Sequence, residues 1–246
     1  MSSQARRPRN VIVFQHDRLE HPGLFRNFFR EDGFQLLTVE VDEGEPIPNL
    51  DGFDLMVVMG GPQQVWEEGQ YPWLRPEKAA IRKFVREMQR PYLGICLGHQ
   101  LLADSLGGRV APAKSPEIGV LPLSKTPIGE TDQAMSDVPD PPTFFLWHGA
   151  EVIEVPVGAE VLAASDACPI QALRFNQLAY GLQFHAEVTP ETIANWGTIP
   201  DYVSLLEDAI GPDPIANLRS QVSAGLPRLN RNARILYDGL KAAWSF

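Results

Sequence analysis

The sequence predicts an α/β fold in which helices cover both faces of a mostly parallel sheet, giving a three-layer sandwich with added antiparallel strands. In the first half of the chain, short β-branched runs alternate with stretches of helical period, and strands joined by helices pair in parallel. Past Gly108, proline-punctuated strand patterns follow one another, which is typical of antiparallel additions. With 246 residues, 44% of them hydrophobic, the chain can bury a full core.

The first half of the chain supplies the parallel part of the expected sheet. Strands are expected at four short apolar runs, 11–15, 36–41, 55–59 and 91–96. Helices are expected between and after them, at 24–30, 76–90 and 98–106. The 76–90 stretch shows the helical pattern most fully, because its apolar residues recur every three or four positions.

The second half is expected to add strands and then a helical tail. The strand patterns lie at 120–123, 143–147, 170–175 and 178–184. Apolar residues of the tail recur with helical period, and either the 211–214 Gly-Pro-Asp-Pro cluster or the 225–227 Gly-Leu-Pro stretch is expected to break the preceding helix. The expected domain plan is a flexible N-terminus (1–9), one main domain (10–199) and a helical extension packed on it (200–246).

Charge and cysteine content exclude several classes of protein. The formal net charge of −10 repels phosphate backbones and anionic lipids, so neither nucleic acid nor a membrane is an expected partner. No apolar run approaches the roughly 18 residues that a membrane helix needs. Cys96 and Cys168 cannot form a disulfide framework and lack the paired spacing of a zinc site, so we expect a cytoplasmic protein without metal.

A Gly-Ile-Cys-Leu-Gly turn places Cys96 between an expected strand and an expected helix. This is the thiol form of the nucleophile elbow, a sharp turn that lifts the reactive atom clear of its neighbours. The amide of Leu97 and the positive helix end both face the reaction partner of the sulfur, which favours the thiolate. Cys168, before Pro169 in an expected loop, is interpreted as a packed thiol.

The stretch Gly-Leu-Gln-Phe-His-Ala-Glu-Val-Thr (181–189) ends a strand with a histidine and a glutamate two positions apart. Alternate residues of a strand point to the same side, so Glu187 can orient the ring of His185 while the other ring nitrogen faces outward. A cysteine elbow with such a pair is a generalised catalytic triad. The histidines at 16, 21 and 99 are interpreted as structural.

A Met-Gly-Gly-Pro turn (59–62) follows another expected strand. Paired glycines let backbone amides approach a substrate carbonyl, although Gly-Gly-Pro is also common in plain turns. The three motifs, in this order, resemble the class I (triad-type) glutamine amidotransferases, and the resemblance covers about residues 11–196. It implies a flavodoxin-like catalytic domain over 10–199 that needs no cofactor.

The resemblance also implies a role for individual residues. The triad would consist of the nucleophile Cys96, the general base and acid His185, and the orienting residue Glu187. The oxyanion hole would be formed by the amides of Gly60, Gly61 and Leu97. The substrate contacts would come from Gln100 and from the turn at Trp147, His148 and Gly149.

Three functions remain open from the sequence. The first is a glutaminase that hydrolyses the glutamine side-chain amide through a cysteine thioester and passes ammonia to a separate synthetase, since the chain has no Walker-type phosphate loop. The second is a stand-alone γ-glutamyl hydrolase or peptidase whose pocket is enlarged by residues 196–215. The third is a catalytically silent binding module, which the intact triad disfavours.

Overall fold

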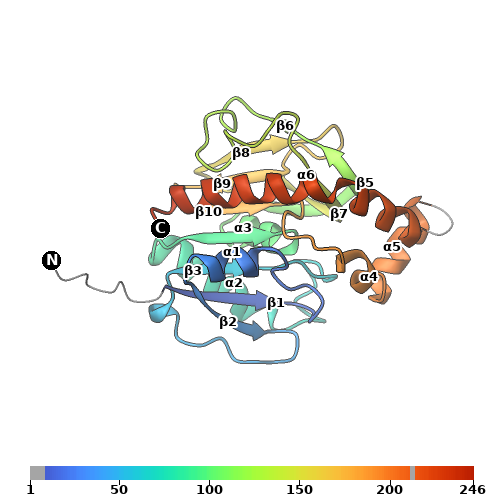
Figure 1. The fold of residues 1–246 in the computed structure, drawn as a ribbon. Helices are drawn as coiled ribbons and strands as arrows, with labels where there is room; N and C mark the ends of the chain where they lie inside the picture. Colours follow the sequence, from blue (N-terminus) through green and yellow to red (C-terminus); the bar gives the residue numbers. More distant parts are fainter. Residues whose placement is uncertain (1–8, 211–213) are drawn as a thin grey trace.

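The computed structural model describes residues 9–210 and 214–246, and within them eight strands form one central sheet (Figure 1). Their spatial order is β2 (Gln35–Glu40), β1 (Asn10–Gln15), β3 (Leu55–Val58), β4 (Tyr92–Ile95), β10 (Ala179–Leu182), β9 (Ala172–Phe175), β8 (Ala159–Ala164) and β6 (Ser124–Lys125). The pairs from β2 to β10 are parallel, and those from β10 to β6 are antiparallel. The predicted mixed sheet is therefore confirmed.

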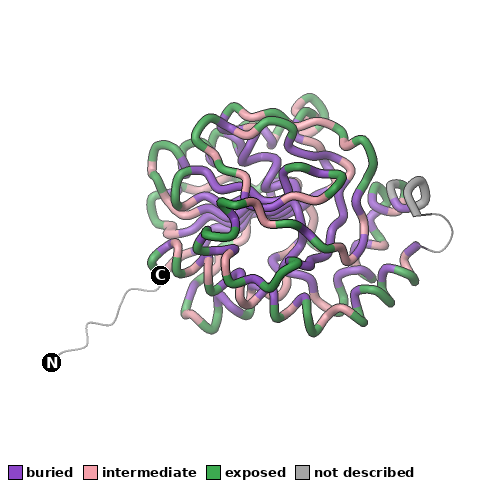
Figure 2. The backbone as a smooth tube through the Cα atoms, turned by 90° about the horizontal axis from the view of Figure 1, so that it is seen from above, coloured by how far each residue is buried: buried purple, intermediate pink, exposed green. Residues whose placement is uncertain are grey.

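Helices cover both faces of this sheet, because its central strands are apolar on both sides. On β1, Val11 and Val13 face a core that includes α1 (Phe25–Glu31) and α6 (Pro214–Ala243). Ile12 and Phe14 face the opposite core, which includes α2 (Leu74–Arg82) and α3 (Leu97–Ser105). Figure 2 shows the buried backbone running through the centre of the molecule, with exposed segments at its rim.

A separate antiparallel pair, β5 (Arg109–Pro122) and β7 (Thr143–Glu154), lies beside α6. Both strands are longer than the apolar runs that predicted them. Their register shifts between Pro112, which pairs with Ala150, and Glu117, which pairs with His148, so the irregular stretch of β5 lies opposite Gly149 of β7. Short helical turns at η1 (Leu50–Gly52) and η2 (Lys83–Glu87) complete the layers.

The C-terminal part forms α4 (Thr192–Trp196), α5 (Pro200–Ile210) and α6. The prediction that 225–227 breaks a helix was wrong, because α6 continues through Pro227. Pro227 is exposed, so the backbone carbonyl that loses its partner can bond to water while buried Val222 and Leu229 hold the helix on the core. Residues 1–8 of the expected flexible N-terminus (1–9), and residues 211–213 of the other expected helix break, lie outside the described residues.

In the described part of the chain, every helix is too short or too polar to cross a bilayer. The longest, α6, carries charged residues along its length and contributes one apolar face to the cores described above.

Replacing Gly98 with alanine is expected to destabilise the fold, because a Cβ there would lie 2.1 Å from the carbonyl oxygen of Val58 on β3. Overpacking of this kind typically costs about 1–3 kcal/mol. Gly69→Ala is the matched control, since a Cβ at Gly69 meets nothing within 4 Å. Urea unfolding followed by circular dichroism measures both variants, and equal free energies of unfolding would contradict a tight contact between α3 and β3.

Candidate active site

The ends of β4 and β10 bring two distant parts of the sequence together. These strands pair in parallel, with Ile95 opposite Leu182, and the amide of Cys96 donates a hydrogen bond of 2.8 Å to the carbonyl oxygen of Leu182. Cys96 therefore leaves the sheet at the same edge as His185 and Glu187. Carboxyl ends of parallel strands are the usual place for ligand sites in such sheets.

Cys96 occupies a strained backbone position between β4 and α3. Its φ of 52° and ψ of −105° lie outside the ordinary regions for residues with a Cβ. The flanking glycines permit this turn, because a Cβ on Gly94 would lie 2.3 Å from the carbonyl oxygen of Gly98. The backbone thus forms the elbow that the sequence predicts, with Leu97 as the first residue of α3.

His185 is held between a carboxylate and a sulfur. Its Nδ1 donates a hydrogen bond of 2.7 Å to Oε1 of Glu187, and both residues are almost completely buried. Burial alone lowers the pKa of His185, but the charges and hydrogen bonds of Glu187 and Cys96 outweigh burial and raise that pKa well above its ordinary value. The geometry therefore favours a protonated imidazole beside the sulfur.

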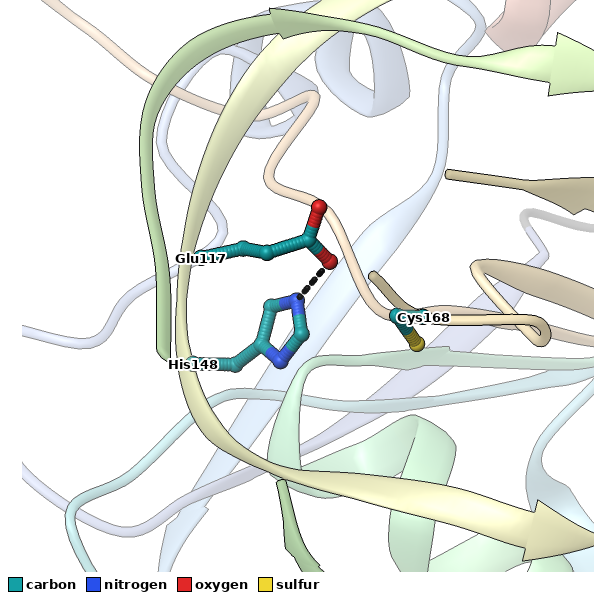
Figure 3. A group of neighbouring side chains, drawn as sticks. All are labelled: Glu117, His148 and Cys168. Carbon is teal, nitrogen blue, oxygen red and sulfur yellow. Dashed lines mark ion pairs between the residues drawn. The ribbon is translucent and has the colours of Figure 1, made fainter. Parts of the chain in front are cut away.

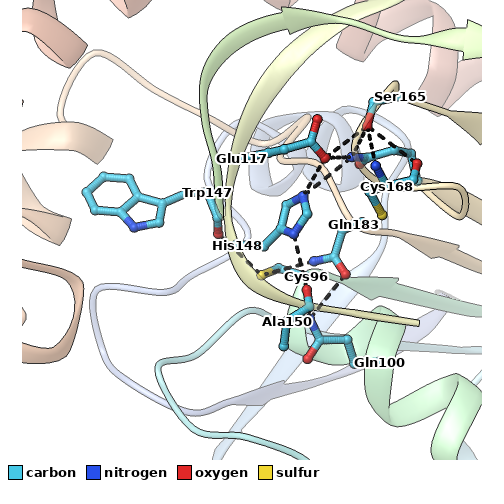
Figure 4. Close-up of polar contacts among 10 residues, drawn as sticks. Cys96, Gln100, Glu117, Trp147, His148, Ala150, Ser165, Cys168 and Gln183 are labelled. Atoms are coloured by element: carbon cyan, nitrogen blue, oxygen red, sulfur yellow. Dashed lines mark hydrogen bonds and ion pairs between the residues drawn. The ribbon is translucent and has the colours of Figure 1, made fainter. Parts of the chain in front are cut away.

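One side-chain amide and one backbone carbonyl contact the Cys96 sulfur, and a second amide supports the first (Figure 4). Nε2 of Gln183 lies 3.6 Å from the sulfur, and the carbonyl oxygen of Trp147 lies 3.8 Å from it. Nε2 of Gln100 donates bonds of 3.1 Å to Oε1 of Gln183 and to the carbonyl oxygen of Ala150. Sequence reasoning missed Gln183, which directly follows the end of β10 at Leu182, two positions before His185.

A cavity of about 330 Å³ opens beside the sulfur. Its lining includes most of the residues that the family resemblance singled out, namely Cys96, Gly61, Leu97, Gln100, Trp147, His148 and Gly149. Gly60 lies in the same turn, and a Cβ there would meet His185 Cε1 at 3.4 Å. Among the described residues, the amides of Gly61 and Leu97 donate no hydrogen bond to protein, so both remain available to a ligand.

The C-terminal helices contribute aromatic side chains to the same region. The ring of Trp196, from α4, stands edge-on to His185 with centroids 4.6 Å apart. Tyr202, from α5, packs against Trp147 with centroids 5.2 Å apart and lines the cavity. This wall shields His185 from water, and neither aromatic residue carried a local motif that could have identified it.

The histidines interpreted as structural take no part in this arrangement. His16 is buried, with Nε2 2.9 Å from Oε1 of Glu77 and Nδ1 2.8 Å from the carbonyl oxygen of Gly60. Burial lowers the pKa of His99 to about 3, so this ring is neutral. The pKa of the partly buried His21 is also lowered, first by burial and then by Arg26.

Glu20, in the loop between β1 and α1, is a carboxyl group that sequence reasoning missed. It is fully buried, and neither carboxylate oxygen forms a hydrogen bond of ordinary length. A Cβ on Gly60 would lie 2.7 Å from Oε2 of Glu20, so Glu20 and His185 flank the same glycine. Burial, and to a smaller extent Glu187, raises the pKa of Glu20 to about 7, although His185 and Tyr202 oppose this shift.

Glu20→Gln is expected to change how stability depends on pH. The pKa of Glu20 rises from 4.5 to about 7 on folding, so between these values the folded chain binds more protons than the unfolded chain. The free energy of unfolding should therefore fall as pH rises through this window, by up to about 3 kcal/mol from this group. Urea unfolding at several pH values tests this, and parallel profiles for wild type and Glu20→Gln would contradict it.

Comparison with known proteins supports the motif-based resemblance. The profile of the family described as glutamine amidotransferase class-I matches residues 24–195. YfeJ, a glutamine amidotransferase-like protein of Salmonella typhimurium, is 31% identical over 234 residues, covering 94% of this chain and 96% of that protein. One subunit of the glutamine-hydrolysing GMP synthase of Saccharolobus solfataricus is 37% identical over 145 residues, covering 58% of this chain and 72% of its own length.

A solved structure gives the same result. A glutamine amidotransferase from Thermotoga maritima superposes with a TM-score of 0.83 at 28% identity, covering 97% of this chain and 99% of that one. The matched family range contains the elbow and the histidine motif that first indicated the resemblance. The chain belongs to the class-I glutamine amidotransferase family.

Proposed function

We propose that the protein hydrolyses the side-chain amide of glutamine, with Cys96 as nucleophile, His185 as acid and base, and Glu187 as the group that orients the imidazole. The observation that carries the proposal is the contact of His185 with both Glu187 and Cys96, together with the cavity that Cys96 lines. A protonated imidazole next to the sulfur favours the thiolate, which is the reactive form of cysteine. Both cysteines are free thiols, which suits a reducing cytoplasmic setting.

In the first half of the reaction, the Cys96 thiolate attacks the amide carbon of glutamine. The amides of Gly61 and Leu97 would stabilise the negative oxygen, since both line the cavity beside the sulfur. His185 then gives its proton to the leaving nitrogen, the carbon–nitrogen bond breaks, and ammonia leaves. A γ-glutamyl thioester remains on Cys96.

In the second half, neutral His185 takes a proton from water, and the hydroxide formed attacks the thioester. The carbon–sulfur bond breaks, glutamate leaves, and the thiolate–imidazolium pair returns. The bond from Nδ1 to Glu187 keeps the opposite ring nitrogen directed at the reacting atoms. The aromatic wall of Trp196 and Tyr202 restricts bulk water around this ring.

The released ammonia would pass to a separate acceptor enzyme. The relative from Saccharolobus solfataricus is named as one subunit of a glutamine-hydrolysing synthase, and 72% of its length matches this chain. A synthetase partner is therefore part of the proposal.

One observation favours a second candidate, the hydrolysis of larger γ-glutamyl compounds. The cavity extends from the elbow to Asp201 and Tyr202, which belong to α5 outside the matched family range. Its volume of about 330 Å³ falls within the usual range for small-molecule pockets. The part of the cavity beside Asp201 and Tyr202 could therefore hold a substituent on the γ-amide nitrogen of the substrate.

Cys96→Ala is expected to abolish glutamine hydrolysis without unfolding the protein, because the side chain is small and the turn itself depends on its glycines. A glutamine-like diazo-ketone should alkylate the wild-type chain at Cys96 and spare Cys168, whose pKa burial and Glu151 raise to about 12. Ammonia release and peptide mass mapping measure the two results. Retained activity in Cys96→Ala, or labelling at Cys168 instead, would show that another group is the nucleophile.

A direct comparison of substrates separates the two candidate functions. We expect kcat/KM for ammonia release from glutamine to exceed that for cleavage of γ-glutamyl-glycine by at least about tenfold, which corresponds to about 1.4 kcal/mol of transition-state binding. Cys96→Ala protein, purified in the same way, supplies the blank for contaminating hydrolases. A higher kcat/KM for the dipeptide would favour the γ-glutamyl hydrolase.

A further inference from the structure

Residues 147–149, which the sequence placed in a turn, lie within strand β7, and a second group of polar side chains lies behind them. This Glu117 cluster is formed by Glu117 on β5, His148 and Glu151 on β7, and Cys168 in the loop between β8 and β9. Single ligand atoms of Glu117, His148 and Cys168 all lie within 4.8 Å of one another (Figure 3). Three separate segments therefore place a carboxylate, an imidazole and a thiol around one point.

The ring of His148 is held between two acceptors. Its Nδ1 lies 3.1 Å from the carbonyl oxygen of Ala150, which can only accept a hydrogen bond, so Nδ1 carries a proton. On the other side, Nε2 lies 3.3 Å from Oε2 of Glu117. Nε2 of Gln171 donates a hydrogen bond of 2.7 Å to the same Glu117 oxygen and lies 3.4 Å from Nε2 of His148. A metal ion that binds both Glu117 and His148 would displace this amide contact.

The geometry fits a tetrahedral metal ion. Typical zinc–nitrogen and zinc–oxygen bonds place two such ligand atoms about 3.3–3.5 Å apart, and Nε2 of His148 is 3.3 Å from the Glu117 oxygen. The Nδ1 contact to a backbone carbonyl is the outer contact that metal-bound histidines usually make. The sulfur of Cys168 would have to approach these two atoms by about 1 Å to complete three bonds.

Glu151 gives an independent indication of a missing ligand. Its side chain lies against the Cys168 thiol, the residue is 7% exposed, and its Oε2 has no hydrogen-bond partner. Among the ion pairs of the described residues, Glu117 pairs only with His148, and Glu151 with none. Leaving a buried carboxylate oxygen without a partner is costly, and a divalent ion would supply one.

We propose that the Glu117 cluster binds a structural zinc ion. Sulfur, nitrogen and oxygen ligands together suit zinc, whereas magnesium and calcium prefer oxygen alone. Binding would release the thiol proton of Cys168 to solvent, and Glu151 would be the fourth ligand. A site closed by protein ligands is structural rather than catalytic.

The ion would hold residues 147–149 of β7 in place from the side away from the cavity. His148 connects through the carbonyl of Ala150 to Gln100, and Gln100 connects through Gln183 to the Cys96 sulfur (Figure 4). The ion would thus join β5, β7 and the β8–β9 loop at a point linked to the nucleophile. This role does not depend on the reaction proposed above.

The test uses the full chain without a histidine tag, dialysed against zinc and then against metal-free buffer. Elemental analysis should find about one zinc ion per chain. Cys168→Ser and Glu117→Gln should each weaken zinc binding at least about tenfold, as measured by competition with a chromophoric chelator. Cys96→Ala is the matched control, because it removes a thiol outside the cluster and should retain the ion.

Cobalt substitution tests by absorption whether the sulfur of Cys168 is a ligand. The wild-type cobalt protein should show a thiolate-to-cobalt charge-transfer band and the visible absorption of tetrahedral cobalt, and Cys168→Ser should lose the charge-transfer band. Circular dichroism checks that each variant is folded. Three results would each overturn the proposal: equal zinc contents in wild type and Cys168→Ser, loss of the band in Cys96→Ala instead of Cys168→Ser, or a wild-type chain that binds no zinc.

Discussion

The parallel pairing of β4 with β10 is the constraint on which the rest of the site depends. It sets Ile95 opposite Leu182 and directs the two strand ends to one edge, so that Gln183 reaches the sulfur of a residue 87 positions away in the sequence. β10 ends at Leu182, so a slip of one residue would turn Leu182 to the opposite face and displace Gln183 and His185 relative to Cys96. The buried apolar residues on both faces of the sheet prevent such a slip.

The two buried carboxyl groups near His185 differ because only Glu187 is hydrogen-bonded to the imidazole ring. Glu187 accepts a hydrogen bond from the ring and favours its charged form, whereas Glu20 has no hydrogen bond of ordinary length. With a pKa of about 7, Glu20 is protonated in part of the population at neutral pH. Its environment can therefore hold a neutral acid next to an imidazolium, which avoids placing two full negative charges beside one cation.

Local patterns predicted the parts of the site that lie within single motifs. The elbow follows from two glycines around Cys96. The predicted bond between His185 and Glu187 is present, although the strand expected to carry these residues ends at Leu182. Glu20 and Tyr202 could not be predicted, because their positions depend on how a loop and a distant helix pack. The same reason explains α6, where tertiary packing of the apolar face outweighs the local preference of Pro227.

Local sequence patterns could not predict the proposed zinc site, for a related reason. The sequence argued against a metal because Cys96 and Cys168 lack paired spacing, but such spacing identifies only sites whose ligands share a short loop. Ligands from two strands and a loop have no fixed spacing, since the β5–β7 register alone brings Glu117 opposite His148. That register includes the irregular stretch of β5 after Pro112, which lies opposite Gly149 of β7. The same stretch therefore positions the Glu117 carboxylate for the ion.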